Sequence, residues 1–355
     1  MKLMRLRGVY AAGAALALSL LFQASGSAQA PSGTFRLATI DVNGDPRLAA
    51  TAGDGQNDIL DVHNGIRYLM QSGAPEAANL PYIPTDMRTL AGSGPRATTA
   101  IKQVYQTLAA QKAAGKLKDP GGQYRVFYPM TGVKFMAPVT NPSKIYGFAG
   151  NYPREGDLAN PQFPSSFFKA VSSLGGHNDI IDLNGLIDHG VHESELSLVI
   201  GKRGKNIPES QALSYVFGYM VCNDVSSREL AQGKHPTQGA TFDKGLDTFS
   251  PCGPFLTLAE DVKDPQNLGL SVKIHGKDVP MPNPNTKFMT FKIPQIIAYV
   301  SGRMTLEVGD IFQTGVPAPV VPMKAGDDIE ITIEGLGPPL HNTVVADAKK
   351  GENGK

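Results

Sequence analysis

Tryptophan is absent from this chain of 355 residues, and cysteine occurs only twice, as Cys222 and Cys252. Two cysteines cannot form the disulfide framework of a small secreted domain, and a chain of this length can build a core without one. We therefore expect two buried thiols, with a single disulfide as the alternative. Charge of one sign is also lacking, because 33 basic and 32 acidic residues leave a net charge of +1. Without a basic stripe or an acidic tail, nothing indicates a nucleic-acid partner.

Long apolar runs are missing except near the start of the chain. There, three basic residues precede an apolar stretch over residues 9–22, and small residues follow up to Ala30. This order predicts a secretory signal peptide over residues 1–30, cut after Ala28 or Ala30, and hence a secreted or periplasmic protein. An uncleaved membrane anchor is the alternative, but the run is short for a span of about 20 residues. Once the signal is removed we expect no membrane partner, and the formal charge becomes 30 − 32 = −2.

Glycine and proline are abundant, with 39 and 27 residues, which favours many short strands and tight turns over long helices. The length suits one large domain or two smaller ones. We predict a domain over residues 31–125, a strand-rich domain over 126–346 and a flexible tail over 347–355. We expect an opening strand over residues 34–42 and helices over 65–72, 98–115, 209–216 and 293–302.

The pair Glu193-x-Glu195 opens a strand-like run. Alternate residues of a strand share a face, so Leu196, Leu198 and Ile200 form a core face. The two glutamates then point the other way, roughly 7 Å apart along the strand. Two such carboxylates repel each other, and a hard divalent cation with oxygen ligands would remove the repulsion. For an isolated pair the ordinary interpretation is a solvated strand face.

Three later segments add polar groups of the same kind. Asp224 ends a predicted strand and is either a turn residue or a third carboxylate for a cation. Lys244, beside a glycine, is either a surface lysine or a cation that holds an anionic substrate and stabilises an enolate. Thr314 and Gly315 offer a hydroxyl and a backbone N–H to a carboxylate.

These motifs, in this order, resemble the fumarylacetoacetate hydrolase family over residues 144–344. The motifs that carry the resemblance are Gly150-Asn151-Tyr152, Pro164-Ser165-Ser166-Phe167-Phe168-Lys169, Glu193-x-Glu195, Asn223-Asp224-Val225-Ser226-Ser227-Arg228, Asp243-Lys244-Gly245-Leu246-Asp247-Thr248-Phe249, Pro251-Cys252-Gly253-Pro254, Asn285-Thr286 and Thr314-Gly315-Val316-Pro317.

The resemblance implies an α+β, β-rich fold, a roll of mixed β-sheets with a smaller N-terminal domain, and a homodimer. The catalytic domain is then the one over residues 126–346. Glu193, Glu195 and Asp224 would hold a divalent cation, with Mg²⁺ as the first choice and Mn²⁺ or Ca²⁺ as alternatives. The implied substrate is a small 2-oxo or 2,4-dioxo acid whose oxygens contact the cation. Lys244 and Thr314 would hold the same oxygens.

The resemblance also assigns roles to further residues. Substrate binding falls to Tyr152, Lys169, Arg228, Thr314 and Gly315, and catalysis to Lys244 and Glu155.

The sequence departs from the family pattern where hydrolytic members carry a water-activating histidine and an acid. Here Glu155 stands at the histidine position and Leu158 at the acid position. Glu155 is either a carboxylate base whose pKa is raised by partial burial, or a surface residue of a mobile lid. Other candidates for the missing base are His177, His189, His192 and His235, although His192 should lie on the strand face opposite Glu193. A second departure is Val316, where many members have threonine.

We therefore expect a metal-dependent hydrolase that cleaves a C–C bond of an acylpyruvate-like acid through an enolate stabilised by the cation. An isomerase or a decarboxylase acting on a 2-oxo acid at the same site is the first alternative, because neither needs the water-activating pair. An exported binding protein that holds the metal and the oxo acid without turnover is the alternative from another class.

Overall fold

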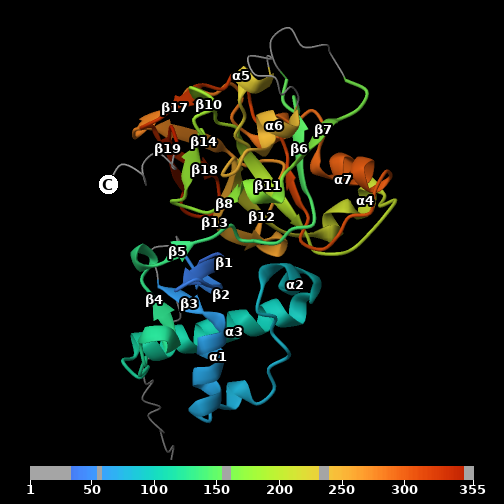
Figure 1. The fold of residues 1–355 in the computed structure, drawn as a ribbon. Coiled ribbons are helices and arrows are strands. Elements are labelled where there is room, and N and C mark those ends of the chain that lie inside the picture. Colours follow the sequence, from blue (N-terminus) through green and yellow to red (C-terminus); the bar gives the residue numbers. More distant parts are fainter. Residues whose placement is uncertain (1–32, 54–57, 154–160, 232–239, 348–355) are drawn as a thin grey trace, which may run out of the picture.

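The computed structural model of the protein describes residues 33–53, 58–153, 161–231 and 240–347 (Figure 1). The predicted signal peptide, the chain from residue 348 onward, Glu155 and His235 lie outside these ranges, so the predictions for them stay predictions. In the ranges that are described, no helix is long and apolar enough to cross a membrane.

A large mixed sheet forms the frame of the molecule. Its twelve strands are β1 (Phe35–Val42), β2 (Asp45–Ala52), β3 (Ile59–Asp61), β4 (Phe127–Tyr128), β5 (Lys134–Phe135), β6 (Ile145–Ala149), β7 (Ser165–Lys169), β8 (Leu174–Gly175), β11 (Ser194–Ile200), β12 (Val216–Asn223), β13 (Ser250–Leu258) and β16 (Ile311–Gln313). Ten of them follow the order β4-β3-β2-β1-β13-β12-β11-β16-β6-β7, while β5 pairs with β1 and β8 with β13. Most neighbours are antiparallel, but β6 runs parallel to β16.

Two smaller sheets complete the β-rich part of the chain. The first has the order β15-β14-β18-β19-β9, with β9 (Ile180–Asp182), β14 (Leu270–Ile274), β15 (Lys277–Asp278), β18 (Asp328–Ile333) and β19 (Leu340–Val345). The second pairs β10 (His189–Val191) with β17 (Pro322–Lys324). The expected β-rich, mixed-sheet fold is confirmed.

The helices are few, as the glycine and proline content predicts. Those in the described ranges are α1 (Val62–Gln71), α2 (Met87–Gly92), α3 (Pro95–Ala113), α4 (Glu209–Ala212), α5 (Arg228–Ala231), α6 (Ala240–Gly245) and α7 (Ile293–Ser301). Helix α3 starts three residues before its predicted position because Pro95, with its preset backbone angle, occupies the first helical position. The helix predicted over residues 209–216 is shorter, since the α-helix ends at Ala212 and a 3₁₀ turn follows.

Strand β11 lies inside the large sheet, between β12 and β16. Leu196, Leu198 and Ile200 belong to the main hydrophobic core, so the predicted core face is confirmed. The opposite face is buried as well, because Glu195 is fully buried and Val199 joins a second core. The interpretation of Glu193-x-Glu195 as a solvated strand face is therefore wrong.

The N-terminal region adds its strands directly to this sheet. Strand β1 pairs antiparallel with β13, with Leu37 opposite Leu256. Helices α1 and α3 lie beside this end of the sheet (Figure 1), and the core there combines Ile101 of α3 with Val199 of β11 and Met220 of β12. Hydrogen bonding between strands thus continues across residue 125, where we predict the domain boundary.

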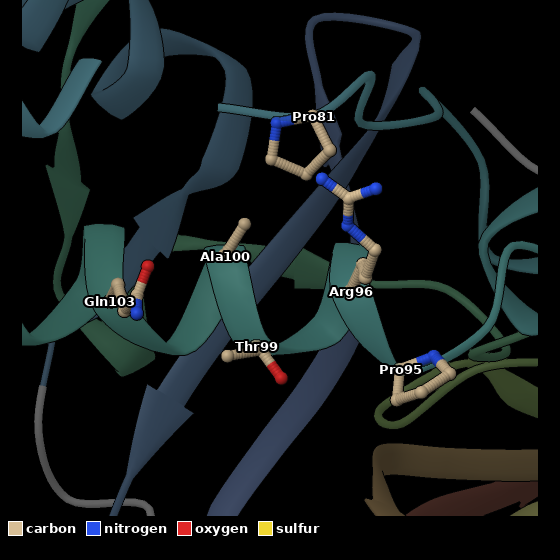
Figure 2. A pocket seen from close by; sticks show the side chains of 6 residues that line it. All are labelled: Pro81, Pro95, Arg96, Thr99, Ala100 and Gln103. Carbon is tan, nitrogen blue, oxygen red and sulfur yellow. The ribbon is translucent and has the colours of Figure 1, made fainter. Parts of the chain in front are cut away.

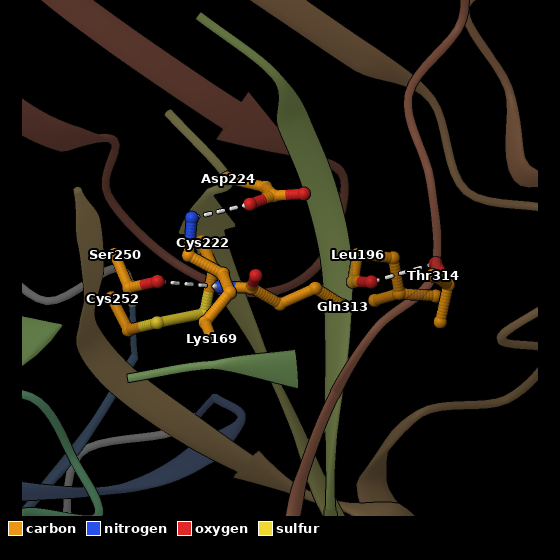
Figure 3. The surroundings of a disulfide bond; sticks show 8 residues. All are labelled: Lys169, Leu196, Cys222, Asp224, Ser250, Cys252, Gln313 and Thr314. Carbon is orange, nitrogen blue, oxygen red and sulfur yellow. Dashed lines mark hydrogen bonds and ion pairs between the residues drawn. A yellow bond between two sulfur atoms is a disulfide. The ribbon is translucent and has the colours of Figure 1, made fainter. Parts of the chain in front are cut away.

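Cys222 and Cys252 form a disulfide, so the expectation of two free thiols is wrong (Figure 3). The two cysteines lie opposite each other on the neighbouring strands β12 and β13, with their Cα atoms 4.2 Å apart. Both side chains are fully buried. The number of cysteines and their spacing do not reveal this pairing, since it depends on the register of two strands.

Candidate active site

Three carboxylates converge at one end of the central strands. Glu193, Glu195 and Asp224 each place an oxygen within 4.8 Å of the others. Glu193 directly precedes β11, and Glu195 is the second residue of that strand. Asp224 directly follows β12, which pairs antiparallel with β11. Alternation puts Glu193 and Glu195 on one face, and the pairing of Ser194 with Asn223 places Asp224 beside Glu193.

The backbone around the carboxylates is held by side chains of the same two segments. The Asn223 side-chain oxygen accepts a 2.8 Å hydrogen bond from the N–H of Glu193, and the N–H of Asp224 donates to the Glu193 carbonyl at 2.8 Å. The Ser226 hydroxyl donates to Oε1 of Glu193 at 2.8 Å. These contacts fix Glu193, which is the one partly exposed carboxylate of the three.

Glu195 is fully buried and has one oxygen in use. Its Oε2 accepts a 2.7 Å hydrogen bond from the N–H of Gly315, while Oε1 has no hydrogen-bond partner among the described residues. Burial raises the pKa of the Glu195 carboxyl well above its usual range, and the charges of Asp224 and Glu193 raise it further. A buried oxygen without a partner, next to two more carboxylates, suits a hard divalent cation.

Two buried lysines balance part of the charge of these carboxylates. Lys169 Nζ lies 2.5 Å from Oδ1 of Asp224 (Figure 3), and Lys244 Nζ lies 2.9 Å from both Oδ2 of Asp224 and Oε2 of Glu193. Burial by itself would raise the pKa of Asp224, but Lys169 and Lys244 outweigh it and hold that pKa below its usual value. Burial would lower the pKa of Lys244, yet the charges of Asp224 and Glu193 raise it overall. These ion pairs therefore favour the charged forms of Asp224 and Lys244.

Three other predicted residues lie around the carboxylates. Tyr152 is 1% exposed, and its hydroxyl has no hydrogen-bond partner in the described part of the chain. Burial, and next the charge of Glu195, raise the pKa of Tyr152 above its ordinary value. The Thr314 hydroxyl donates to the Leu196 carbonyl at 2.7 Å (Figure 3), and the Gly315 N–H is used on Glu195. In this structure both groups therefore orient β11, and their role in substrate binding stays a prediction.

Arg228 is exposed at the start of α5. Of the histidines considered as replacement bases, His192 is fully buried, and its Nδ1 lies 3.3 Å from the Ser194 hydroxyl. His177 contacts the ring of Phe135, and His189 lies 3.3 Å from a carboxylate oxygen of Glu229.

Asn151 is a site residue whose function the sequence does not reveal. It is buried, and its Nδ2 donates to the carbonyls of Phe291 at 3.0 Å and Thr314 at 2.8 Å. Its Oδ1 accepts from the N–H of Phe291 at 2.8 Å. Asn151 thus joins three distant segments next to Tyr152. The available signal was its place in the Gly150-Asn151-Tyr152 motif.

A separate pocket of about 320 Å³ lies on the N-terminal region, along α3 (Figure 2). Its lining contains no carboxylate or histidine and consists of Pro81, Pro95, Arg96, Thr99, Ala100 and Gln103. It therefore lacks the ligands of a metal site and the usual groups for acid–base catalysis.

Residues 144–345 match the model of the fumarylacetoacetate (FAA) hydrolase C-terminal family. The chain belongs to this family. It is 38% identical over 264 residues to 2,4-didehydro-3-deoxy-L-rhamnonate hydrolase of a Sphingomonas species, covering 71% of this chain and 86% of that protein. It is 39% identical over 223 residues to the mitochondrial oxaloacetate tautomerase of Xenopus laevis, covering 60% and 69%.

Solved structures of similar proteins share most of the fold. Maleylpyruvate hydrolase of a Sphingobium species, crystallised with manganese(II) and pyruvate, superposes with a TM-score of 0.63 at 28% identity. The match covers 88% of this chain and 99% of that one. The chain is therefore an enzyme of this family, whose similar proteins include hydrolases and a tautomerase. Its carboxylate trio has the composition and spacing to hold a divalent metal ion.

Proposed function

We propose that this enzyme hydrolyses a C–C bond in a small 2,4-dioxo acid of the acylpyruvate type, using a divalent cation held by Glu193, Glu195 and Asp224. The observation that carries the proposal is the position of Lys244, whose ammonium lies 2.9 Å from two of the three carboxylates. Cleavage next to a carbonyl leaves a carbanion, which is delocalised onto the keto oxygen as an enolate. A fixed positive charge beside that oxygen lowers the barrier.

The cation, when bound, supplies a positive charge for the carboxylate and keto oxygens of the substrate. The chain's own residues do the rest. Lys244 provides a second positive charge from the side of Glu193 and Asp224. Lys169 neutralises Asp224, and the Gly315 N–H fixes the direction of the Glu195 carboxylate. The buried sheet beneath these residues excludes water from that side. For the attacking water we propose Glu155 as the base.

The second candidate is an isomerase, such as a tautomerase, or a decarboxylase that acts on a 2-oxo acid at the same site. The observation that favours it is the pair Glu155 and Leu158, which stand where hydrolytic members carry histidine and acid. Proton transfer through an enolate needs the cation and Lys244 but no activated water. The similarity to an oxaloacetate tautomerase supports this candidate. A binding protein without turnover is the third candidate.

One assay separates hydrolysis, isomerisation and binding without turnover. An acylpyruvate is incubated with the protein in the presence of Mg²⁺ or Mn²⁺ and again with EDTA, with the variant Glu195→Gln as the control. Loss of the enol absorbance with release of pyruvate and the free acid supports hydrolysis. Metal-dependent deuterium exchange at C3, without cleavage, supports the isomerase. If neither occurs while calorimetry detects metal and oxo-acid binding, the protein is a binder.

We further propose Mg²⁺ as the physiological cation, because the site offers only oxygen ligands. The predicted signal peptide and the Cys222–Cys252 disulfide both support an exported protein, since disulfides persist in oxidising compartments. N-terminal sequencing of the mature protein tests export. The homodimer that the family resemblance implies also stays a proposal, which sedimentation or light scattering tests.

A further inference from the structure

Phe167 lies on the sheet face that carries the site. It is directly opposite Gly147 in the pairing of β6 with β7, and Gly147 is in turn opposite Gln313 of β16. Gln313 pairs with Ser197, two residues from Glu195 on β11. Directly opposed residues and alternate residues share a face, so Phe167 and Glu195 belong to the same face.

The ring of Phe167 covers the catalytic lysine. Lys244 Nζ lies 5.1 Å from the ring centroid, within the range of a cation–π contact. The same ammonium contacts Glu193 Oε2, Asp224 Oδ2 and, at 3.1 Å, the Asp224 carbonyl. An ammonium has three donors, so its hydrogen bonds are used on the carboxylate side. The Phe167 ring adds a cation–π contact that needs no further hydrogen-bond donor of the ammonium. The Lys244 side chain is only 8% exposed.

Gly147 provides the space in which this ring sits. A Cβ atom on Gly147 would lie 2.3 Å from Cζ and 2.5 Å from Cε2 of Phe167, closer than real Cβ atoms approach their neighbours. Any side chain at position 147 would therefore displace the ring. The partly buried ring lies between Gly147 on β6 and Lys244 on α6.

We propose that Phe167 is a positioning residue for Lys244: its ring, seated against Gly147, holds the ammonium against Glu193 and Asp224 and shields it from water. The inference rests on the proposed function, in which Lys244 stabilises the enolate. Phe167 itself does not touch the reacting atoms in this account. Its effect passes through the position of the Lys244 ammonium.

Phe168 offers a matched control on the same strand. It points to the other face of the sheet, where its ring lies 4.5 Å from that of Tyr146, and it is 49% exposed. The variants Phe167→Leu and Phe168→Leu make the same chemical change one residue apart. Phe167→Tyr keeps the aromatic face and serves as the conservative variant.

Kinetics form the first arm of the test. We expect Phe167→Leu to lower kcat about 10-fold, which lies between the effects of an exposed and a fully desolvated cation–π contact, with KM changed less than about twofold. Phe167→Tyr should retain most of the turnover, and Phe168→Leu should match the wild type. Equal losses in Phe167→Leu and Phe168→Leu, or no loss in either, would overturn the proposal.

Thermal unfolding of the metal-free protein forms the second arm and needs no activity. Phe167→Leu should lower the Tm less in a Lys244→Met background than in the wild type, because the contact partner is already gone. Phe168→Leu should lower the Tm equally in both backgrounds. Equal shifts for Phe167→Leu in both backgrounds overturn the inference. If the wild type turns over no oxo acid, the proposed function fails, while this second arm still decides whether Phe167 and Lys244 are coupled.

Discussion

The backbone N–H of Gly315 donates a 2.7 Å hydrogen bond to Oε2 of Glu195, and this contact ties the segment after β16 to the most deeply buried carboxylate of the site. Gly315 has φ +98°, a conformation that L side chains rarely adopt. A Cβ atom there would lie 2.8 Å from the Cβ of Asn151, the residue that joins the neighbouring loops. Backbone geometry and the direction of a candidate metal ligand are thus linked at one glycine.

We expect Gly315→Ala to weaken both the fold and the metal site. The unfavourable φ alone costs on the order of 1–3 kcal/mol, and the contact with Asn151 adds to it. The expected result is a lower Tm together with a higher Kd for Mn²⁺ by calorimetry. Gly326→Ala is the control, since Gly326 has φ +90° but nothing within 4 Å of the added Cβ. If both variants bind Mn²⁺ like the wild type, the Gly315 contact does not position Glu195.

Lys244→Met should abolish turnover and make the stability of the fold more sensitive to metal, with a lower Tm in its absence. Removing the ammonium leaves buried carboxylates less compensated, which costs about 3–5 kcal/mol for a broken buried pair. A bound cation restores the balance, so Mn²⁺ should raise the Tm of the variant more than that of the wild type. Scanning calorimetry with and without EDTA measures this difference.

Lys102→Met is the matched control for that experiment. Lys102 also contacts two carboxylates, those of Glu260 and Asp261, but its pairs are partly exposed. Exposed pairs contribute about 1 kcal/mol or less. If Lys244→Met, like Lys102→Met, loses almost no stability in the absence of metal, the Lys244 ammonium does not balance the charge of the buried carboxylates.

His177 should make stability fall in mild acid. Burial, and next the charge of His341, lower the pKa of His177 from 6.5 to about 4 in the folded protein. The unfolded chain therefore takes up a proton first as the pH falls. Above pH 6.5 His177 is neutral in both states and does not lower the free energy of unfolding. Between pH 6.5 and about 4 the free energy of unfolding falls, by up to about 1.4 kcal/mol per pH unit.

The variant His177→Gln isolates this effect. Urea unfolding of both proteins from pH 7.5 to pH 4 gives the difference in unfolding free energy at each pH. Above pH 7 the difference reports packing alone. We expect the free energy of unfolding of the wild type to fall relative to that of His177→Gln as the pH approaches 4. A difference between the two proteins that stays constant with pH would show that His177 does not titrate in this range.

The disulfide should contribute substantially to stability. Cys222 and Cys252 are 30 residues apart, and a cross-link of that loop length stabilises a fold by about 3–4 kcal/mol in the chain-entropy model. The variants Cys222→Ala and Cys252→Ala should each remove it. The double variant should then be little less stable than either single one, as measured by urea unfolding under non-reducing conditions. Losses that simply add would indicate two independent thiols instead.

Sequence reasoning gave correct local structure wherever a repeat or an end signal was present. The alternation along Leu196, Leu198 and Ile200 predicts a core-facing strand, and the helix predicted over residues 98–115 is found as α3. The order of motifs also assembled the carboxylate trio, because each of them lies at the end of a recognisable strand. The failed predictions concern pairings between segments. Glu195 was open to interpretation as solvated because burial of the second strand face depends on what covers it.

Residue types, strand alternation and motif order are written along the chain, and they predicted the convergence of Glu193, Glu195 and Asp224, the β-rich class and the family. The pairing of Cys222 with Cys252, the contact of Gly315 with Glu195 and the position of Phe167 over Lys244 become visible only in the folded chain. The physical reason is that each of these contacts joins segments distant in sequence. Strand register and close packing bring such segments together, and neither is a property of any one stretch of residues.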